Sequence, residues 1–141
     1  MKHWWVNHKK TWKQEVEGGY LWSPKTENGE RNSEFYNNMR RASPGDTVFS
    51  YADTRIRRIG IVTGYALTAP IPGEFPDSGN VWAKTGWRLP VSWMRSDLNF
   101  IPKNHIEQIR TLLPKKYSPI RSWSNRMERG GCRIVRRIRR F

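Results

Sequence analysis

The stretch Pro44-Gly45-Asp46-Thr47-Val48-Phe49-Ser50-Tyr51 decides the fold. Its proline, glycine and aspartate are typical of a tight turn, and the β-branched and aromatic residues after them favour a strand. A second strand is predicted over residues 55–65, where apolar and polar side chains partly alternate. Two consecutive strands of a β-sheet are therefore expected over residues 47–65.

A strand and a helix are predicted on the N-terminal side of this stretch. His3–Asn7 is rich in aromatic and β-branched residues and is expected to be the first strand. A turn at Gly18-Gly19 separates it from Tyr20-Leu21-Trp22. A helix is expected to begin at residue 32 or 33 and to end near residue 41, because apolar side chains recur there at helical spacing. These side chains are Phe35, Tyr36 and Met39.

The C-terminal side adds a loop, a strand and a helix. Residues 70–79 are rich in proline and glycine and predict a loop. Residues 87–94 predict a strand that begins as early as Val81, and Pro90 within it indicates an edge or a bulge. A helix is predicted over residues 102–113 from the spacing of its isoleucines and leucines. The sum is about five or six strands with two helices, which predicts an α+β domain built on a curved sheet or pseudo-barrel.

Positive charge is the strongest signal in the composition. The chain has 26 lysines and arginines against 12 acids, a net charge of +14. Such a surplus attracts polyanions, either nucleic acid or an anionic membrane surface. Residues 121–141 hold eight arginines and one acid, so half of the net charge lies there. We therefore divide the chain into a domain over residues 1–120 and an arginine-rich tail over residues 121–141, which is a strand, a helix or a basic arm that orders on a polyanion.

No complete catalytic site is visible in the sequence. Cys132 is the single cysteine, so no internal disulfide or multi-cysteine zinc site is expected, and a reducing, cytoplasmic compartment is predicted. His3, His8 and His105 are expected to be exposed polar residues rather than parts of a metal site or a triad. The sequence has no glycine-rich phosphate loop. We predict no enzymatic activity, no cofactor, no metal and no membrane-spanning segment.

The order of several short motifs resembles a known domain. The motifs are Trp4-Trp5-Val6-Asn7, Gly19-Tyr20-Leu21-Trp22-Ser23-Pro24, Met39-Arg40-Arg41, residues 44–51 and Ile59-Gly60-Ile61-Val62. This order, within residues 3–117, resembles the EVE domain of the PUA-like superfamily, a relative of the YTH domain. It looks most like the EVE modules found N-terminal to HNH nucleases in modification-dependent restriction systems.

The resemblance implies a PUA-like pseudo-barrel that binds a modified base, expected to be 5-methylcytosine or 5-hydroxymethylcytosine flipped out of DNA. Extrusion costs roughly a few kcal/mol of stacking, which an aromatic sandwich and hydrogen bonds to the base edge can return. Trp22 matches the position of the first cage tryptophan of the YTH relatives and is expected to form one wall. The other candidates are Asn7 and Ser23 as polar contacts, Tyr51 as the opposing wall, Asp53 and Thr54 as readers of the cytosine amine, and Trp82 or Trp87 as the closing ring.

Each assignment has a plainer structural alternative. Trp22 would be a packed core residue, Ser23 a turn residue, Asn7 a strand-end hydrogen-bonding residue, and Asp53 the cap of a local turn. The candidate phosphate contacts, each otherwise a solvated cation, are Lys25, Arg31, Arg40, Arg41, Arg55, Arg57 and Arg58.

The sequence departs from the family in two places. The HNH nuclease half is missing, so cleavage would require a separate nuclease partner. The arginine-rich tail replaces the apolar, strand-like end of the family, which suggests the hypothesis of a divergent or frame-shifted end of a formerly longer protein.

Three functions remain open from the sequence. The leading one is a reader of modified cytosine in DNA. The alternative is a protein that binds RNA or a modified RNA base, and the third is a small interaction or structural protein whose charge assists association with polyanions.

Overall fold

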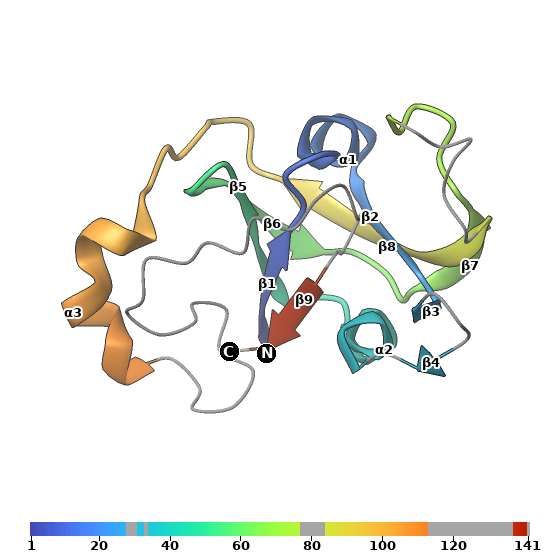
Figure 1. Cartoon of the computed structure of the whole chain (residues 1–141), viewed down its shortest axis with the longest axis horizontal. Coiled ribbons are helices and arrows are strands. Elements are labelled where there is room, and N and C mark those ends of the chain that lie inside the picture. Colours follow the sequence, from blue (N-terminus) through green and yellow to red (C-terminus); the bar gives the residue numbers. More distant parts are fainter. Residues whose placement is uncertain (28–30, 33, 77–83, 113–136, 141) are drawn as a thin grey trace.

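The computed structural model describes residues 1–27, 31–32, 34–76, 84–112 and 137–140 (Figure 1). Its larger sheet has the strand order β2-β8-β6-β5-β1-β9, and β7 also pairs with β8. Neighbouring strands run antiparallel except β1 and β5, which are parallel. The strands of this sheet are β1 (His3–Asn7), β2 (Tyr20–Pro24), β5 (Thr47–Ala52), β6 (Arg55–Val62), β7 (Leu67–Pro70), β8 (Thr85–Trp93) and β9 (Arg137–Arg140).

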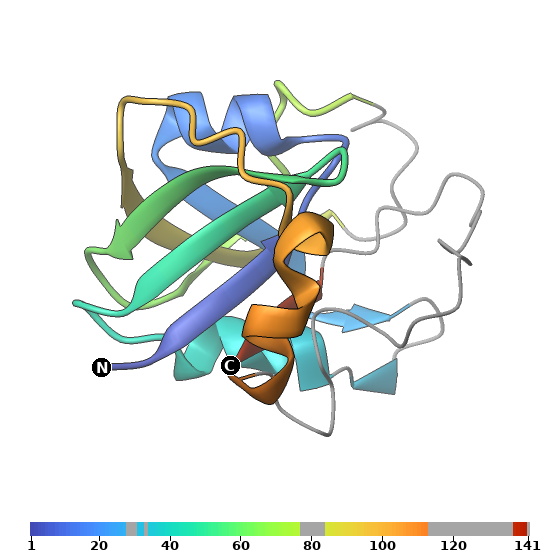
Figure 2. The ribbon, with the colours of Figure 1, turned by 90° about the vertical axis from the view of Figure 1, so that its left-hand side faces the viewer.

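Two helices lie at opposite ends of the curled sheet. Figure 2 shows the sheet rolled into a half-barrel, with α1 above it and α2 below it. The α+β fold with a curved sheet and flanking helices that the sequence predicts is thus confirmed. The remaining elements are α1 (Trp12–Gly18), α2 (Glu34–Arg41), the hairpin of β3 (Thr26–Glu27) and β4 (Arg31–Asn32), and the helical segments η2 (Pro102–His105), α3 (Ile106–Ile109) and η3 (Arg110–Leu112).

The main hydrophobic core fills the concave side of the sheet. Side chains alternate between the two faces of a strand, and the inward ones here are almost all apolar. Met39 of α2 belongs to this core. The buried members are Trp4, Val6, Leu21, Met39, Ala42, Val48, Val62, Leu89 and Val91.

Four elements differ from those expected. The sequence does not predict α1, in which Trp12 and Val16 are the large apolar residues. The strand expected over residues 55–65 ends at Val62, and β7 forms where no strand is expected. The helix expected over residues 102–113 is split into three short helical segments, and Leu112 is 74 % exposed, so its spacing does not mark a core face.

The end of the arginine-rich tail joins the sheet. Arg137–Arg140 pairs antiparallel with β1, with Ile138 opposite Val6. Of the three conformations considered for the tail, these four residues therefore adopt the strand. Residues 113–136 lie outside the described part of the chain.

Pro90 lies inside β8 and not at the edge of the sheet. The amide of Val91 donates to the carbonyl oxygen of Gly19 on the β2 side, so the backbone of Pro90 faces the other side. On that side, β8 pairs with β6 as far as Val62 and with β7 from Leu67 onward, and Pro90 lies between these two partners. The carbonyl oxygen of Pro90 accepts from the amide of Thr63. The missing N–H of proline thus falls between two partner strands, where no ladder bond is lost.

Asp46 ties the N-terminal strand to the turn before β5. Its Oδ1 accepts from the amide of Lys2 at 2.9 Å, and its Oδ2 accepts from Trp4 Nε1 at 2.9 Å and from the amide of Ser43 at 3.0 Å. Burial alone would raise the pKa of this carboxyl, but the three hydrogen bonds outweigh burial and lower the pKa. The carboxylate form is therefore favoured by folding.

Asp46→Asn is expected to lower the free energy of unfolding by about 2 kcal/mol, because the amide nitrogen cannot accept and leaves at least one of the three donors without its acceptor. Since the pKa of Asp46 is lowered in the folded state, its contribution is present above the ordinary carboxyl pKa and disappears as pH falls through the folded value. Urea unfolding over a pH series measures both effects. The exposed Glu107→Gln serves as the control, and a difference from wild type that persists at the lowest pH would contradict this role of Asp46.

Candidate nucleic-acid interface

Trp87 of β8 is the centre of a mixed aromatic and polar cluster. Ser23 of β2 is its direct cross-strand neighbour on one side, and Thr68 of β7 is its neighbour on the other. Directly paired residues place their side chains on the same face of a sheet. The Trp87 ring is half-buried, so one part packs on the core while another part meets solvent.

Two cations lie over the Trp87 ring. Lys25 Nζ is 4.1 Å from the ring centroid, and its ammonium also donates to Thr68 Oγ1 at 2.6 Å. The guanidinium carbon of Arg40, from α2, is 5.3 Å from the same centroid. A tryptophan face attracts cations through its quadrupole, and cations at this place also attract phosphate. We call Ser23, Lys25, Arg40, Thr68 and Trp87 the Trp87 site.

Ser23 brings an unsatisfied hydroxyl to this site. The residue is 2 % exposed, and within the described ranges its Oγ has no hydrogen-bond partner. A buried hydroxyl without a partner costs roughly 1–3 kcal/mol, so folded proteins rarely keep one without a reason. The hydroxyl is enclosed, so a ligand at Trp87 can use it as a donor or acceptor only when neighbouring side chains move aside.

Trp22 lies on the other face of β2 and is covered. Its ring is 1 % exposed and meets the edge of Phe75 at a centroid distance of 6.0 Å. Its Nε1 donates to the carbonyl oxygen of Ala69 at 3.2 Å. Beside it, Tyr20 donates its hydroxyl to Glu74 at 2.6 Å, and burial, followed by this contact, raises the pKa of Tyr20. A base can stack on Trp22 only if Phe75 moves aside.

The remaining pocket candidates gather at the ends of β1 and β5. Asn7 is exposed and is paired with Tyr51, whose ring packs on Trp5 at 5.0 Å and whose pKa is raised by burial. Asp53 and Thr54 form the tip of the β5–β6 hairpin. Strand alternation directs the Tyr51 ring away from Ser50 and from the concave face. Trp82 lies outside the described residues.

Several of the candidate phosphate contacts are already occupied. Arg57 pairs with Asp53 at 3.6 Å, and Arg58 pairs with Asp97 at 2.8 Å. Lys25 and Arg40 remain directed at Trp87, as described above. The others are Arg41, exposed beside Asn38; Arg55, which donates to Asn99; and Arg31, whose side chain lies outside the described part.

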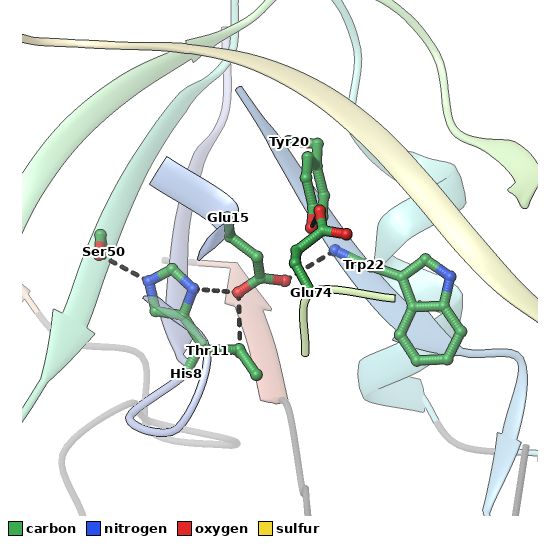
Figure 3. Close-up of polar contacts among 7 residues, drawn as sticks. All are labelled: His8, Thr11, Glu15, Tyr20, Trp22, Ser50 and Glu74. Carbon is green, nitrogen blue, oxygen red and sulfur yellow. Dashed lines mark hydrogen bonds and ion pairs between the residues drawn. The ribbon is translucent and has the colours of Figure 1, made fainter. Parts of the chain in front are cut away.

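A buried polar chain, which the sequence does not indicate, links β1, α1, β2 and β5 (Figure 3). His8 Nδ1 lies 2.5 Å from Glu15 Oε2, and His8 Nε2 lies 2.6 Å from Ser50 Oγ. The other oxygen of Glu15 accepts from the amide of Trp22 at 2.8 Å, and Thr11 Oγ1 donates to Oε2 at 3.2 Å. We call His8, Thr11, Glu15 and Ser50 the polar chain. The expectation that His8 is exposed is wrong, since it is 2 % exposed.

The polar chain has the connectivity of a serine–histidine–acid triad. Ser50 and Glu15 are both 0 % exposed, and Ser50 lies within β5 and not at a strand end. A nucleophile must reach its substrate, and this hydroxyl is enclosed. The arrangement is instead suited to fixing the chain on both sides of α1, because each polar group finds its partner inside the fold. No helix in the described part of the chain is long and apolar enough to cross a membrane.

The chain is similar to several solved structures. Rpa0253 from Rhodopseudomonas palustris is 21 % identical with a TM-score of 0.42, over 70 % of this chain and 63 % of that protein. A Pseudomonas putida protein is 15 % identical with a TM-score of 0.45, over 78 % and 81 %. Human THYN1, solved in complex with DNA containing 5-methylcytosine, is 11 % identical with a TM-score of 0.43, over 79 % of each chain. No family model and no curated protein matches the chain. The function therefore has to be inferred from its own side chains.

Proposed function

We propose that this protein is a cytoplasmic nucleic-acid-binding module that recognises a modified base, 5-methylcytosine or 5-hydroxymethylcytosine flipped out of DNA. One observation carries the proposal: the unpartnered hydroxyl of Ser23 lies beside a half-buried Trp87 with two cations over its ring. An aromatic face, a polar group for the base edge and cations for the phosphates are the three things a flipped nucleotide needs.

The base would stack on Trp87 in the place that Lys25 occupies in the unbound protein. Lys25 is held there by a cation–π contact and one hydrogen bond, both of which a long, flexible side chain can exchange for a phosphate. Arg40 reaches the same ring from α2 and would contact the next phosphate. Ser23 would then hydrogen-bond the edge of the base.

We propose binding rather than catalysis as the activity of this chain. The polar chain around Glu15 is enclosed, and the groups at the Trp87 site are a hydroxyl pair, cations and an aromatic ring. These groups orient and hold an anionic ligand. Cutting of DNA would fall to a separate nuclease.

Ser23→Ala tests the proposal, because its expected effects on stability and on binding have opposite signs. Removal of an unsatisfied buried hydroxyl should leave the free energy of unfolding unchanged or raise it by about 1 kcal/mol. The same change should weaken binding of the modified duplex about tenfold, the value of one hydrogen bond near 1.4 kcal/mol. Fluorescence anisotropy at one stated salt concentration measures the affinity.

Ser92→Ala, an exposed position on the same strand as Trp87, is the control and should leave both quantities as they are. Equal affinity of the wild-type protein for modified and plain duplex would refute the proposal. Tighter binding to a matched RNA oligonucleotide than to either duplex would favour the RNA-binding alternative instead.

A further inference from the structure

The segment from His8 to Glu15 is anchored on one side and basic on the other. His8, Thr11 and Glu15 point inward and are 2 %, 1 % and 0 % exposed. The residues between them point outward: Lys9, Lys10 and Lys13 are exposed, and Trp12 is half-buried. The polar chain therefore holds the backbone of this segment while three lysines and a tryptophan face solvent.

Arg57 extends this surface from the neighbouring β6 strand. Its guanidinium carbon lies 5.1 Å from the centroid of the Trp12 ring, and its Nε donates to the carbonyl oxygen of Ala52 at 3.2 Å. Lys13 Nζ lies 5.9 Å from the same ring. We call Lys9, Lys10, Trp12, Lys13 and Arg57 the basic ridge.

The tip of the β5–β6 hairpin stands beside the basic ridge in a strained conformation. Asp53 and Thr54 have φ values of 50° and 68°, a region that residues with a side chain rarely adopt and a threonine least of all. Lys9 Nζ reaches Asp53 at 3.3 Å, and Arg57 reaches its other oxygen at 3.6 Å. Strain of this kind persists where the surroundings hold it and is frequent at functional sites.

We propose that the basic ridge is a second nucleic-acid contact, separate from the Trp87 site, which binds backbone phosphates. This inference rests on the proposed function for its ligand, but it concerns different residues. Ion pairs between exposed groups are weak and are screened by salt, so Lys9 can leave Asp53 for a phosphate. Trp12 offers a face on which an unpaired base can stack.

The double variant Lys9→Gln/Lys13→Gln tests the ridge in the 141-residue chain. Each lost phosphate contact flattens the slope of log affinity against log salt by about 0.9, so the slope should flatten by about 2. When salt is raised from 50 to 200 mM, the factor by which affinity falls should therefore be roughly ten times smaller for the variant than for the wild type. Affinity for modified and plain duplex should fall by the same factor, because phosphates carry no base identity.

The matched control is Lys103→Gln/Arg110→Gln, which removes two exposed cations from the helical segment at the left of Figure 1, away from α1. An equal change of slope in both double variants, or no change in the ridge variant, would overturn the proposal. The test is independent of base recognition. If the protein shows no preference for modified DNA, but the salt slope of its affinity still depends on the ridge, the ridge proposal stands and the proposed function is refuted.

Discussion

Glu15→Ala is expected to lower the free energy of unfolding by about 4 kcal/mol, because it breaks up a buried set of hydrogen-bonded polar groups. Glu15 is 0 % exposed and accepts from Thr11 Oγ1, His8 and the amide of Trp22. Truncation leaves an imidazole and a backbone amide buried without an acceptor, which adds their desolvation to the cavity.

Glu17→Ala provides the comparison for this substitution, because Glu17 is an exposed acid of the same helix and should change stability by less than about 0.5 kcal/mol. Urea unfolding followed by tryptophan fluorescence measures both variants. Ser50→Ala should fall between them, since it removes one hydrogen bond of the chain. Similar losses in Glu15→Ala and Glu17→Ala would contradict the structural role of the polar chain.

The turns and the helix that carry local signals could be predicted from the sequence. Pro44-Gly45-Asp46 forms its turn before β5, and the turn expected at Gly18-Gly19 is present, with Gly19 in a left-handed conformation that glycine adopts at little cost. The helix near residues 32–41 appears as α2 because its apolar spacing matches its packing on the core. Each of these signals lies within a few neighbouring residues.

The polar chain could not be predicted because its partners are far apart in sequence. Ser50 is 42 residues from His8, and the register of β1 against β5 brings them together. The parallel pairing of β1 with β5 is itself a long-range property that no local pattern encodes. Without knowledge of this pairing, a histidine that follows a strand is most simply interpreted as an exposed residue.

The residues of the candidate site lie on two faces of the sheet, and the reason is again the geometry of the strands. Trp22 and Ser23 are consecutive, but consecutive residues of a strand face opposite sides of the sheet, so one residue lies under Phe75 and the other beside Trp87. Sequence resemblance places both in one pocket, and it does not choose between Trp82 and Trp87. The pairing of β8 with β2 and β7 sets Trp87 between Ser23 and Thr68.

Trp87→Ala is expected to weaken binding of modified DNA by about 10- to 100-fold, which corresponds to roughly 1–3 kcal/mol of stacking on one base. Trp22→Phe keeps a buried aromatic ring next to Phe75 and should change the affinity much less. Trp22→Ala is a poor probe, because the loss of a fully buried tryptophan lowers the free energy of unfolding by about 3–5 kcal/mol and any loss of binding could follow from unfolding.

The pair Trp87→Ala and Trp22→Phe thus decides which face of β2 receives the base. Thermal unfolding of each variant first establishes that the fold is retained, and titration with modified and plain duplex then gives the preference. If Trp22→Phe abolishes the preference and Trp87→Ala preserves it, the base enters under Phe75, and Phe75→Ala should then tighten binding by removing the ring that covers Trp22. The opposite result leaves the base on Trp87, with Ser23 at its edge and Lys25 displaced to a phosphate.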